Sequence, residues 1–315
     1  MTTDFLPTWL LQLTTLPITF KGVDLVLGQF LGTGDAQGIP GAFCRCAVCE
    51  EARKFEGRFV RRRSSFRLSK RVLIDIGADA VGQSLKYGNF SDVEHILITH
   101  THEDHLNVHM IMEMVWGRKY INSPIHFYLT DKAYEIIEHW RQEKWIIKGS
   151  VSKWEAEGLI VFHRLQFGQT VKIDDFFVTP FRGNHKGNVG EDSALYLIEL
   201  PDNKKLFYGL DSGEYYEDTI KALKDKSIDY FISEATMGVS STPHIQHMRI
   251  CDVYKLVNRL LEQGALNKNS IVYLSHINHS SSHSEMLDEV DKMQFPIKTV
   301  VAYDGMAILG RDETI

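Results

Sequence analysis

The sequence has few cysteines, and this excludes a secreted scaffold held together by disulfides. Four cysteines occur in 315 residues, and three of them are crowded at Cys44, Cys46 and Cys49. Small secreted proteins that depend on disulfides carry a denser set of cysteines. A chain of this length can bury a large apolar core without covalent staples. We therefore expect a reduced, cytoplasmic protein.

Long hydrophobic runs and an excess of positive charge are also lacking. No segment approaches the roughly 20 apolar residues that a membrane span needs. The apolar segment 1–20 has no positive region before it and is broken by Pro7 and Pro17, which is not typical of a signal peptide. We interpret residues 1–23 as an N-terminal extension that packs on the domain. The formal net charge of −6 argues against a general binder of nucleic acids or membrane surfaces.

The sequence does contain a regular alternation of short apolar strands and amphipathic helices. Loops between them are short, and no linker or internal repeat interrupts them, so we predict a single domain over residues 1–315. The basic run 53–71 has nine Lys or Arg and one acid, and is typical of a solvated face. Strands are predicted at 24–31, 72–77, 96–98, 125–129, 159–165, 170–181, 194–200, 205–209, 228–234, 271–274 and 299–302, and helices at 106–116, 132–144 and 248–262.

The segment 96–105 carries the strongest functional signal. An apolar strand ends there in His100, His102, Asp104 and His105. Imidazole and carboxylate groups together suit divalent transition metals. Residues two apart in a strand point to the same side, so His100 and His102 are predicted to face one ion. Asp104 and His105, in the turn that follows, are placed to face a second ion.

Several other polar residues stand where predicted strands end. His185 lies between two glycines, and His276 follows the strand 271–274. Asp211 ends the hairpin 194–209, where it suits either a bridging metal ligand or the cap of the next helix. Asp75 interrupts an apolar strand, so it must be paired or near a metal.

Two further motifs are chemically suggestive. Cys44, Cys46 and Cys49 have the C-x-C-x₂-C spacing that fits one tetrahedral zinc with a fourth ligand from elsewhere; three free thiols are the alternative. The glycine-rich segment 32–40 can present backbone N–H groups to a phosphate, although it matches no nucleotide-binding fingerprint. Arginine suits phosphate well, which draws attention to the run 61–63.

The H-x-H-x-D-H motif at 100–105 resembles the signature of the metallo-β-lactamase superfamily. This resemblance implies an α/β fold, the αββα sandwich, in which two mixed β-sheets lie face to face and helices cover the outer faces. It also implies a hydrolytic site with one or two metals at one edge. The residues that match its ligands are His100, His102 and His185 for the first metal, Asp104, His105 and His276 for the second, and Asp211 for the bridging carboxylate.

A closer resemblance is to the phosphoribosyl 1,2-cyclic phosphate phosphodiesterase family of the carbon–phosphorus lyase pathway. It rests on the segments 32–38, 44–49, 62–65 and 275–279. It implies that His279 completes a structural zinc site with Cys44, Cys46 and Cys49, with Cys251 as the rival ligand. The N-terminal extension, an insertion at 265–270 and the lack of a glycine after His105 depart from the family pattern.

The same family resemblance extends to the catalytic residues. It implies that His247 is the general acid, with His244 as the alternative. Arg63 and Ser64 are the expected substrate contacts.

Together these patterns predict a metal-dependent phosphodiesterase. Two Zn²⁺ or Mn²⁺ ions would activate water, Asp104 and His247 would be catalytic, and one structural Zn²⁺ would be present. The expected partner is a small phosphate ester, with no membrane, nucleic acid disfavoured and a homodimer left open. The alternatives are a tRNA 3′-processing endonuclease, a non-hydrolytic biosynthetic accessory protein, and a β-lactamase or thioesterase.

Overall fold

The computed structural model describes residues 27–118, 123–142 and 150–308. The predicted extension 1–23 lies outside this range, as do the first residues of the predicted strand 24–31 and the last two of the predicted helix 132–144. In the part of the chain that the structure describes, no helix is long and apolar enough to cross a membrane.

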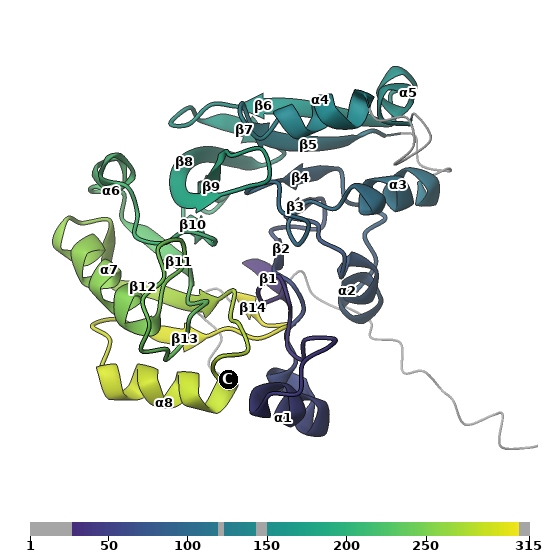
Figure 1. Cartoon of the computed structure of the whole chain (residues 1–315). Coiled ribbons are helices and arrows are strands. Elements are labelled where there is room, and N and C mark those ends of the chain that lie inside the picture. Colours follow the sequence, from purple (N-terminus) through teal and green to yellow (C-terminus); the bar gives the residue numbers. More distant parts are fainter. Residues whose placement is uncertain (1–26, 119–122, 143–149, 309–315) are drawn as a thin grey trace, which may run out of the picture.

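Two seven-stranded sheets form the centre of the molecule (Figure 1). In the first sheet the central strands β3 to β6 are parallel, and β1, β2 and β14 add antiparallel pairs at one side. Its strands, in spatial order, are β14 (Ala307–Ile308), β1 (Leu27–Gly32), β2 (Ser65–Arg67), β3 (Val72–Ile74), β4 (His95–Leu97), β5 (Ile125–Thr130) and β6 (Ile160–Leu165).

The second sheet repeats this mixed arrangement. Strands β10 to β13 are parallel, and β7, β8 and β9 are antiparallel. Its strands, in spatial order, are β13 (Thr299–Val301), β12 (Leu266–Ser275), β11 (Ile228–Glu234), β10 (Lys205–Gly209), β9 (Asp192–Glu199), β8 (Phe176–Lys186) and β7 (Val171–Ile173).

Helices cover the outer faces of both sheets. The core between the sheets is built from Phe66 and Tyr208, among others, while separate apolar clusters join each sheet to its own helices. This layering confirms the predicted αββα sandwich. The helices are α1 (Ala47–Phe55), the 3₁₀ helix η2 (Gly57–Phe59), α2 (Ala80–Tyr87), α3 (Val108–Gly117), α4 (Glu135–Gln142), α5 (Ser150–Ala156), α6 (Glu217–Leu223), α7 (Ile250–Glu262) and α8 (His283–Met293).

The prediction of one strand over 170–181 is wrong. The segment forms an antiparallel hairpin of β7 and the start of β8. Asp174 at the turn has a φ of 52°, a left-handed conformation that Asp tolerates better than most residues. The flanking residues are apolar, and this hides the reversal in the sequence pattern.

The predicted insertion 265–270 forms a bulge in strand β12. Ile228 pairs with Leu266 and Tyr230 with Ile271, so the intervening residues of β12 bulge away from β11. The Ser270 hydroxyl donates to the Ile228 carbonyl at 2.6 Å and closes the bulge. The strand therefore begins before the predicted residue 271.

The basic run 53–71 is not a uniformly solvated face. The Arg61 side chain is buried, with only 2% of the residue exposed. Its guanidinium donates to the Thr33 hydroxyl at 2.8 Å and to the Ala302 carbonyl at 2.7 Å, and contacts His283 Nδ1 at 2.9 Å. Arg61 therefore joins three distant segments of the chain rather than facing solvent.

Candidate metal centre and active site

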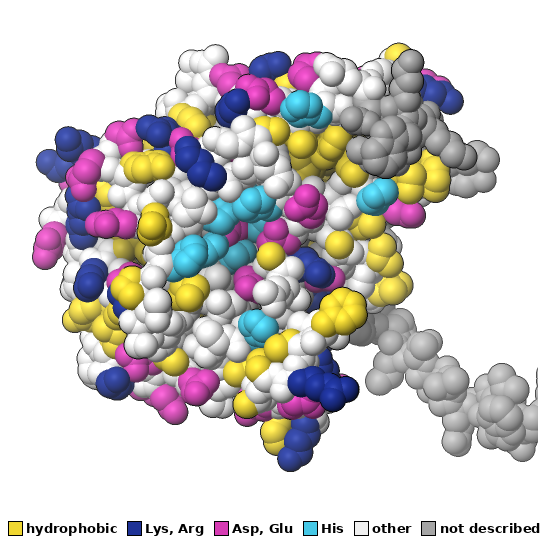
Figure 2. All heavy atoms as spheres, in the orientation of Figure 1, with side chains coloured by type: hydrophobic (Ala, Val, Ile, Leu, Met, Phe, Trp, Pro, Cys, Tyr) yellow, Lys and Arg dark blue, Asp and Glu magenta, His cyan; other side chains and the backbone are white. Residues whose placement is uncertain are grey.

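The polar residues predicted at strand ends meet at one edge of the sandwich. Figure 2 shows histidine side chains gathered in a hollow at the centre of one face, with acidic side chains between and beside them. Asp75, Asp211 and His276, which follow β3, β10 and β12, have φ values of 63°, 48° and 55°. These left-handed conformations are costly for residues with a side chain, and they persist where the surrounding structure fixes them, as at many functional sites.

The first cluster consists of His100, His102 and His185. Their ligand atoms all lie within 4.8 Å of one another. His102 Nδ1 is 2.9 Å from His100 Nε2 and 3.2 Å from His185 Nε2. Burial lowers the pKa of His185 and lowers that of His100 well below its usual range. These two imidazoles are therefore neutral, which is the form that binds metal.

The second cluster consists of Asp104, His105 and His276, with Asp211 beside both clusters. Asp211 Oδ2 lies 2.6 Å from His105 Nε2 and 3.0 Å from His276 Nε2. His105 Nε2 lies 3.1 Å from Asp104 Oδ2. His105 Nε2, His276 Nε2 and Asp211 Oδ2 are buried and have no partner with hydrogen-bond geometry. Buried polar atoms rarely remain unpaired, so this convergence fits ligands that surround a cation.

The buried carboxylates of the second cluster also favour a cation close by. Burial opposes ionisation of Asp211, but His276 and His105 hold its pKa well below the usual range. Burial likewise opposes protonation of His276, yet Asp211 and Asp104 raise its pKa to about 10. Two buried carboxylates thus require nearby cations, either protons on the imidazoles or metal ions that replace them.

Thr99 and Asp75 orient ligands in both clusters. Asp75 is fully buried, and its Oδ2 is 2.7 Å from His105 Nδ1. The Thr99 hydroxyl donates to Asp75 Oδ2 at 2.9 Å and contacts His100 Nδ1 at 3.0 Å. A hydroxyl that donates to a carboxylate must accept from the imidazole, so both Nδ1 atoms carry hydrogen. The Nε2 lone pairs of both histidines are then directed at the site.

Glu234 and Thr236 perform the same task on the other sheet. The Thr236 hydroxyl donates to Glu234 Oε2 and contacts His276 Nδ1 at 2.8 Å. Glu234 Oε2 also lies 3.1 Å from His247 Nδ1. Burial opposes protonation of His247, but Glu234 and Asp211 raise its pKa. This favours an imidazolium beside the metal ligands.

The structure brings His247, rather than His244, to the candidate metal centre. His247 Nδ1 is 3.7 Å from Asp211 Oδ1, and His247 forms a possible ligand group with His185 and Asp211. His244 is exposed, and its Nδ1 accepts from the backbone N–H of Gln246.

A separate cluster unites Cys44, Cys46, Cys49 and His279, whose ligand atoms also lie within 4.8 Å of one another. His279 Nδ1 is 3.4 Å from Cys49 Sγ and 3.7 Å from Cys46 Sγ. Tetrahedral zinc with its usual bond lengths gives an S···N edge of roughly 3.6 Å, so these side chains fit zinc. Cys251 lies outside the cluster and contacts Asp252.

Arg63 and Ser64 are engaged with neighbouring loops. Arg63 forms an ion pair with Asp79 at 3.0 Å and donates to the Ala36 carbonyl. Ser64 is buried, and its hydroxyl donates to the carbonyl of Gly34 at 2.8 Å. A role for either side chain in substrate contact stays a prediction.

Sequence reasoning missed Thr99, Thr236, Glu191 and Glu234 as supports of the site. Glu234 ends an apolar strand, a signal equal to the one that drew attention to Asp75. Glu191 accepts from the backbone N–H of Thr101 at 2.8 Å and is buried, but its loop carries no distinguishing pattern.

Comparisons with known proteins agree with this geometry. The family model of the β-lactamase superfamily domain matches residues 70–277. No curated protein sequence matches the chain significantly. Solved structures with a similar fold include a new diphosphatase from the PhnP family, at 20% identity and a TM-score of 0.66, covering 89% of this chain and 95% of that one.

Two further solved structures are similar over comparable lengths. Zn²⁺-bound PqqB from Methylobacterium extorquens has 17% identity and a TM-score of 0.65, covering 89% of this chain and 99% of that one. The short form of human tRNase Z has 17% identity and a TM-score of 0.59, covering 89% and 98%. At these identities the likeness shows the fold alone.

The resemblance seen in the motifs is thus supported by a family model that spans more than half of the chain, and by clusters whose donor sets suit divalent metals. The chain belongs to the β-lactamase superfamily and has the metallo-β-lactamase fold.

Proposed function

We propose that this protein is a phosphodiesterase that uses two divalent metal ions and carries one structural zinc. The observation that supports it best is the convergence of His105 Nε2, His276 Nε2 and Asp211 Oδ2, buried and without hydrogen-bond partners, next to the three-histidine cluster. His100, His102 and His185 would hold one ion, Asp104, His105 and His276 the other, and Asp211 would bridge them. Bound ions of this kind supply a water of lowered pKa and polarise phosphoryl oxygens.

The protein's own residues supply proton transfer and orientation. His247, held by Glu234 through Nδ1, is placed to donate a proton from Nε2 to the departing ester oxygen. Asp104 lies 3.1 Å from His105 and is 8% exposed, so its carboxylate reaches the floor of the hollow. Thr99, Asp75 and Thr236 keep the ligand tautomers fixed, which preserves the arrangement between turnovers.

A small phosphodiester is the substrate class that we favour. The motifs shared with the phosphoribosyl cyclic phosphodiesterase family make phosphoribosyl 1,2-cyclic phosphate the first substrate to test. The net charge of −6 disfavours a long polyanion such as tRNA. Binding of tRNA that falls steeply with salt, together with cleavage at the 3′ end, would instead favour the endonuclease alternative.

Metal analysis and one synthetic diester test the proposal. Purified protein should contain about three metal ions per chain and should hydrolyse bis(p-nitrophenyl) phosphate with Mn²⁺ or Zn²⁺. Asp104→Asn and His105→Gln should each abolish turnover while the thiol-bound zinc is retained. One zinc per chain and no hydrolysis would indicate the non-hydrolytic accessory protein. Full activity in both variants would show that the catalytic site lies elsewhere.

A further inference from the structure

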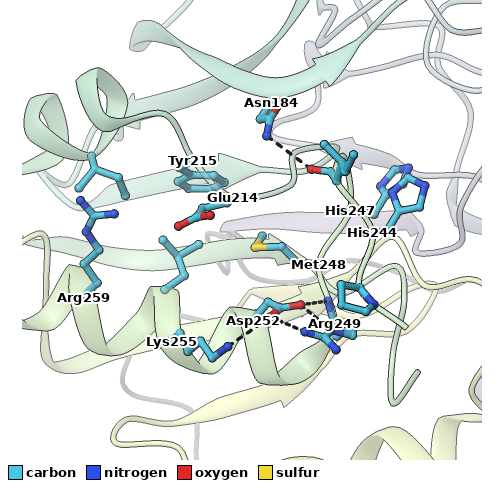
Figure 3. A pocket seen from close by; sticks show the side chains of 14 residues that line it. Asn184, Glu214, Tyr215, His244, His247, Met248, Arg249, Asp252, Lys255 and Arg259 are labelled. Carbon is cyan, nitrogen blue, oxygen red and sulfur yellow. Dashed lines mark hydrogen bonds and ion pairs between the residues drawn. The ribbon is translucent and has the colours of Figure 1, made fainter. Parts of the chain in front are cut away.

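A groove that the proposed mechanism does not use lies between α6, α7 and the loop that carries His247 (Figure 3). This α7 groove has a volume of about 460 Å³. Pockets that bind small molecules usually have volumes of roughly 300–1,000 Å³. The described residues that line it include none of the seven proposed ligands of the catalytic metals. Its size therefore suits a small ligand other than the reacting phosphate.

The loop that carries His247 separates the α7 groove from the metal centre. The Asn184 side chain donates to the Ile245 carbonyl at 3.4 Å, and the Gly213 backbone N–H donates to the Asn184 carbonyl at 3.2 Å. In Figure 3 the Tyr215 side chain lies on one side of the bond between Asn184 and Ile245, and the His247 imidazole lies on the other. The groove is therefore a site of its own, next to the hollow that holds the metal ligands.

One wall of the groove shares an anchor with His247. Met248 lines the groove, and its backbone N–H donates to Glu234 Oε2 at 3.2 Å. The same carboxylate oxygen lies 3.1 Å from His247 Nδ1. A ligand that packs against Met248 therefore acts on the position of the candidate general acid.

The inner surface of the groove is apolar. Tyr215, Ile220, Met248 and Leu256 line it. Ile245, which also lines it, is 83% exposed. Covering apolar surface of this kind is favourable, so the groove suits an aromatic or aliphatic body.

Two cations of α7 border this apolar surface. Lys255 and Arg259 are four residues apart, so they lie on one face of the helix. Lys255 is 76% exposed and lies 3.8 Å from Asp252, while Arg259 is 40% exposed and pairs with the exposed Glu217 at 2.6 Å. Exposed ion pairs contribute little to stability, so both cations are available to an anion.

The acids that line the groove do not cancel its positive charge. Asp252 accepts two hydrogen bonds from the Arg249 guanidinium, at 2.7 and 2.9 Å. Glu214 extends from the wall that carries Tyr215 (Figure 3). Apart from the histidines, the lining side chains carry three positive and two negative charges. The groove therefore favours a ligand with one negative charge.

We infer that the α7 groove is a regulatory site for a small organic anion, with an apolar body and one carboxylate, sulfonate or phosphate group. The body covers Ile245 and Leu256, and the anionic group lies between Lys255 and Arg259. The ligand adds contacts to the exposed segment 241–245, which a long hydrogen bond ties to Asn184. His247 is then held more firmly beside Glu234, and turnover rises. This effect on turnover rests on the proposed function.

Binding of anilinonaphthalene sulfonate to the metal-loaded protein tests the site. This dye joins an aromatic body to one sulfonate, and its fluorescence rises in apolar surroundings. The wild-type protein should bind one equivalent of dye. Lys255→Glu should weaken binding about tenfold, the loss expected for a hydrogen bond to a charged group. Lys221→Glu is the matched control, because Lys221 is an exposed residue of α6 outside the groove; it should bind the dye as the wild type does.

Two further variants change the apolar part of the groove. Leu256→Trp should abolish binding, because the larger side chain fills the groove. Ile245→Ser should weaken binding even if Leu256→Trp does not fold, since Ile245 is exposed and its replacement leaves the packing intact. Zinc retained by Cys44, Cys46 and Cys49 in each variant shows that the chain has folded.

Hydrolysis of bis(p-nitrophenyl) phosphate with Mn²⁺ reports on the coupling to His247. Saturating dye should raise kcat and leave KM unchanged in the wild type and in Lys221→Glu, and it should have no effect in Leu256→Trp. Dye binding that is unchanged in Lys255→Glu and Ile245→Ser would overturn the inference. Competitive inhibition, or an unchanged kcat at saturation, would also overturn it.

Failure of this inference can be told apart from failure of the proposed function. Fluorescence measures binding without turnover, so the site can be mapped in a protein that hydrolyses nothing. Dye binding that responds to the variants as expected, with no hydrolysis of the diester by Mn²⁺- or Zn²⁺-loaded protein, would overturn the proposed function and leave the ligand site in place.

Discussion

Replacing Asp75 with asparagine should weaken metal binding although Asp75 contacts no metal in the proposed site. Asp75 Oδ2 accepts from the Thr99 hydroxyl and lies 2.7 Å from His105 Nδ1. Its Oδ1 accepts from the backbone N–H of Thr99 at 2.8 Å. An asparagine that keeps this last bond turns its NH₂ group toward His105 Nδ1, so two donors face each other. His105 then favours the other tautomer, which places hydrogen on Nε2, where the ion should bind.

The size of the effect follows from the contact that is lost. A hydrogen bond to a charged group is worth roughly 1.5–3 kcal/mol. Loss of a partner that orients a metal-binding histidine typically costs about 10–100-fold in metal affinity, which is about 1.4–2.7 kcal/mol. The two ranges agree. We therefore expect Asp75→Asn to bind its weaker catalytic ion about 10–100 times less tightly and to need correspondingly more Mn²⁺ for half-maximal activity.

Competition with a chromophoric chelator measures this affinity directly. Asp304→Asn is the matched control, because the Asp304 side chain is only 2% exposed, accepts from Thr33 and Arg62, and contacts no candidate ligand. The control should keep wild-type metal affinity. If Asp75→Asn also retained that affinity, the argument that Asp75 fixes the tautomer of His105 would be refuted.

Three further predictions concern the groups around the site. Glu234→Gln should move the alkaline limb of the kcat/KM profile to lower pH, because Glu234 raises the pKa of His247 and the protonated form of His247 donates to the leaving group. If pH–rate measurements show that this limb has not moved, His247 is not the general acid. Cys46→Ser should remove one zinc per chain and lower the melting temperature, as metal analysis and calorimetry would show, while His105→Gln should leave that zinc in place. Burial, with Arg61 and Arg58 nearby, lowers the pKa of His283 to about 4, so the folded state favours the neutral imidazole. The free energy of unfolding should therefore fall by up to about 3 kcal/mol as the pH drops from 6.5 to 4. His283→Gln should flatten that decline in urea titrations at the two pH values, and an equal decline in both proteins would contradict the assignment.

The convergence of the proposed ligands could be predicted because most of them stand where a predicted apolar strand ends. His100, Asp211 and His276 follow the parallel strands β4, β10 and β12, whose ends meet at one edge of the sandwich, and His185 lies near the end of the antiparallel strand β8. The choice of His279 over Cys251 depended on family resemblance, and the geometry agrees with it.

The supporting residues could not be predicted in the same way. Thr99 and Thr236 act through single hydrogen bonds between segments far apart in the chain, and no local pattern records such a bond. The reversal at Asp174 was missed because both arms of the hairpin are apolar. Arg61 was read as solvated because a basic run gives no sign of which member turns inward.

The turn that contains His276 and His279 supplies one ligand to the second cluster and one to the cysteine cluster, and this has a consequence for biosynthesis. In the order in which the ribosome makes the chain, these two histidines follow every other proposed ligand. Neither cluster can be complete until that turn has emerged and β12 has joined the second sheet. The ion of the second cluster and the thiol-bound zinc should therefore load late in the maturation of the protein, and both should be lost together when the placement of this turn is disturbed. The three-histidine cluster is complete without this turn.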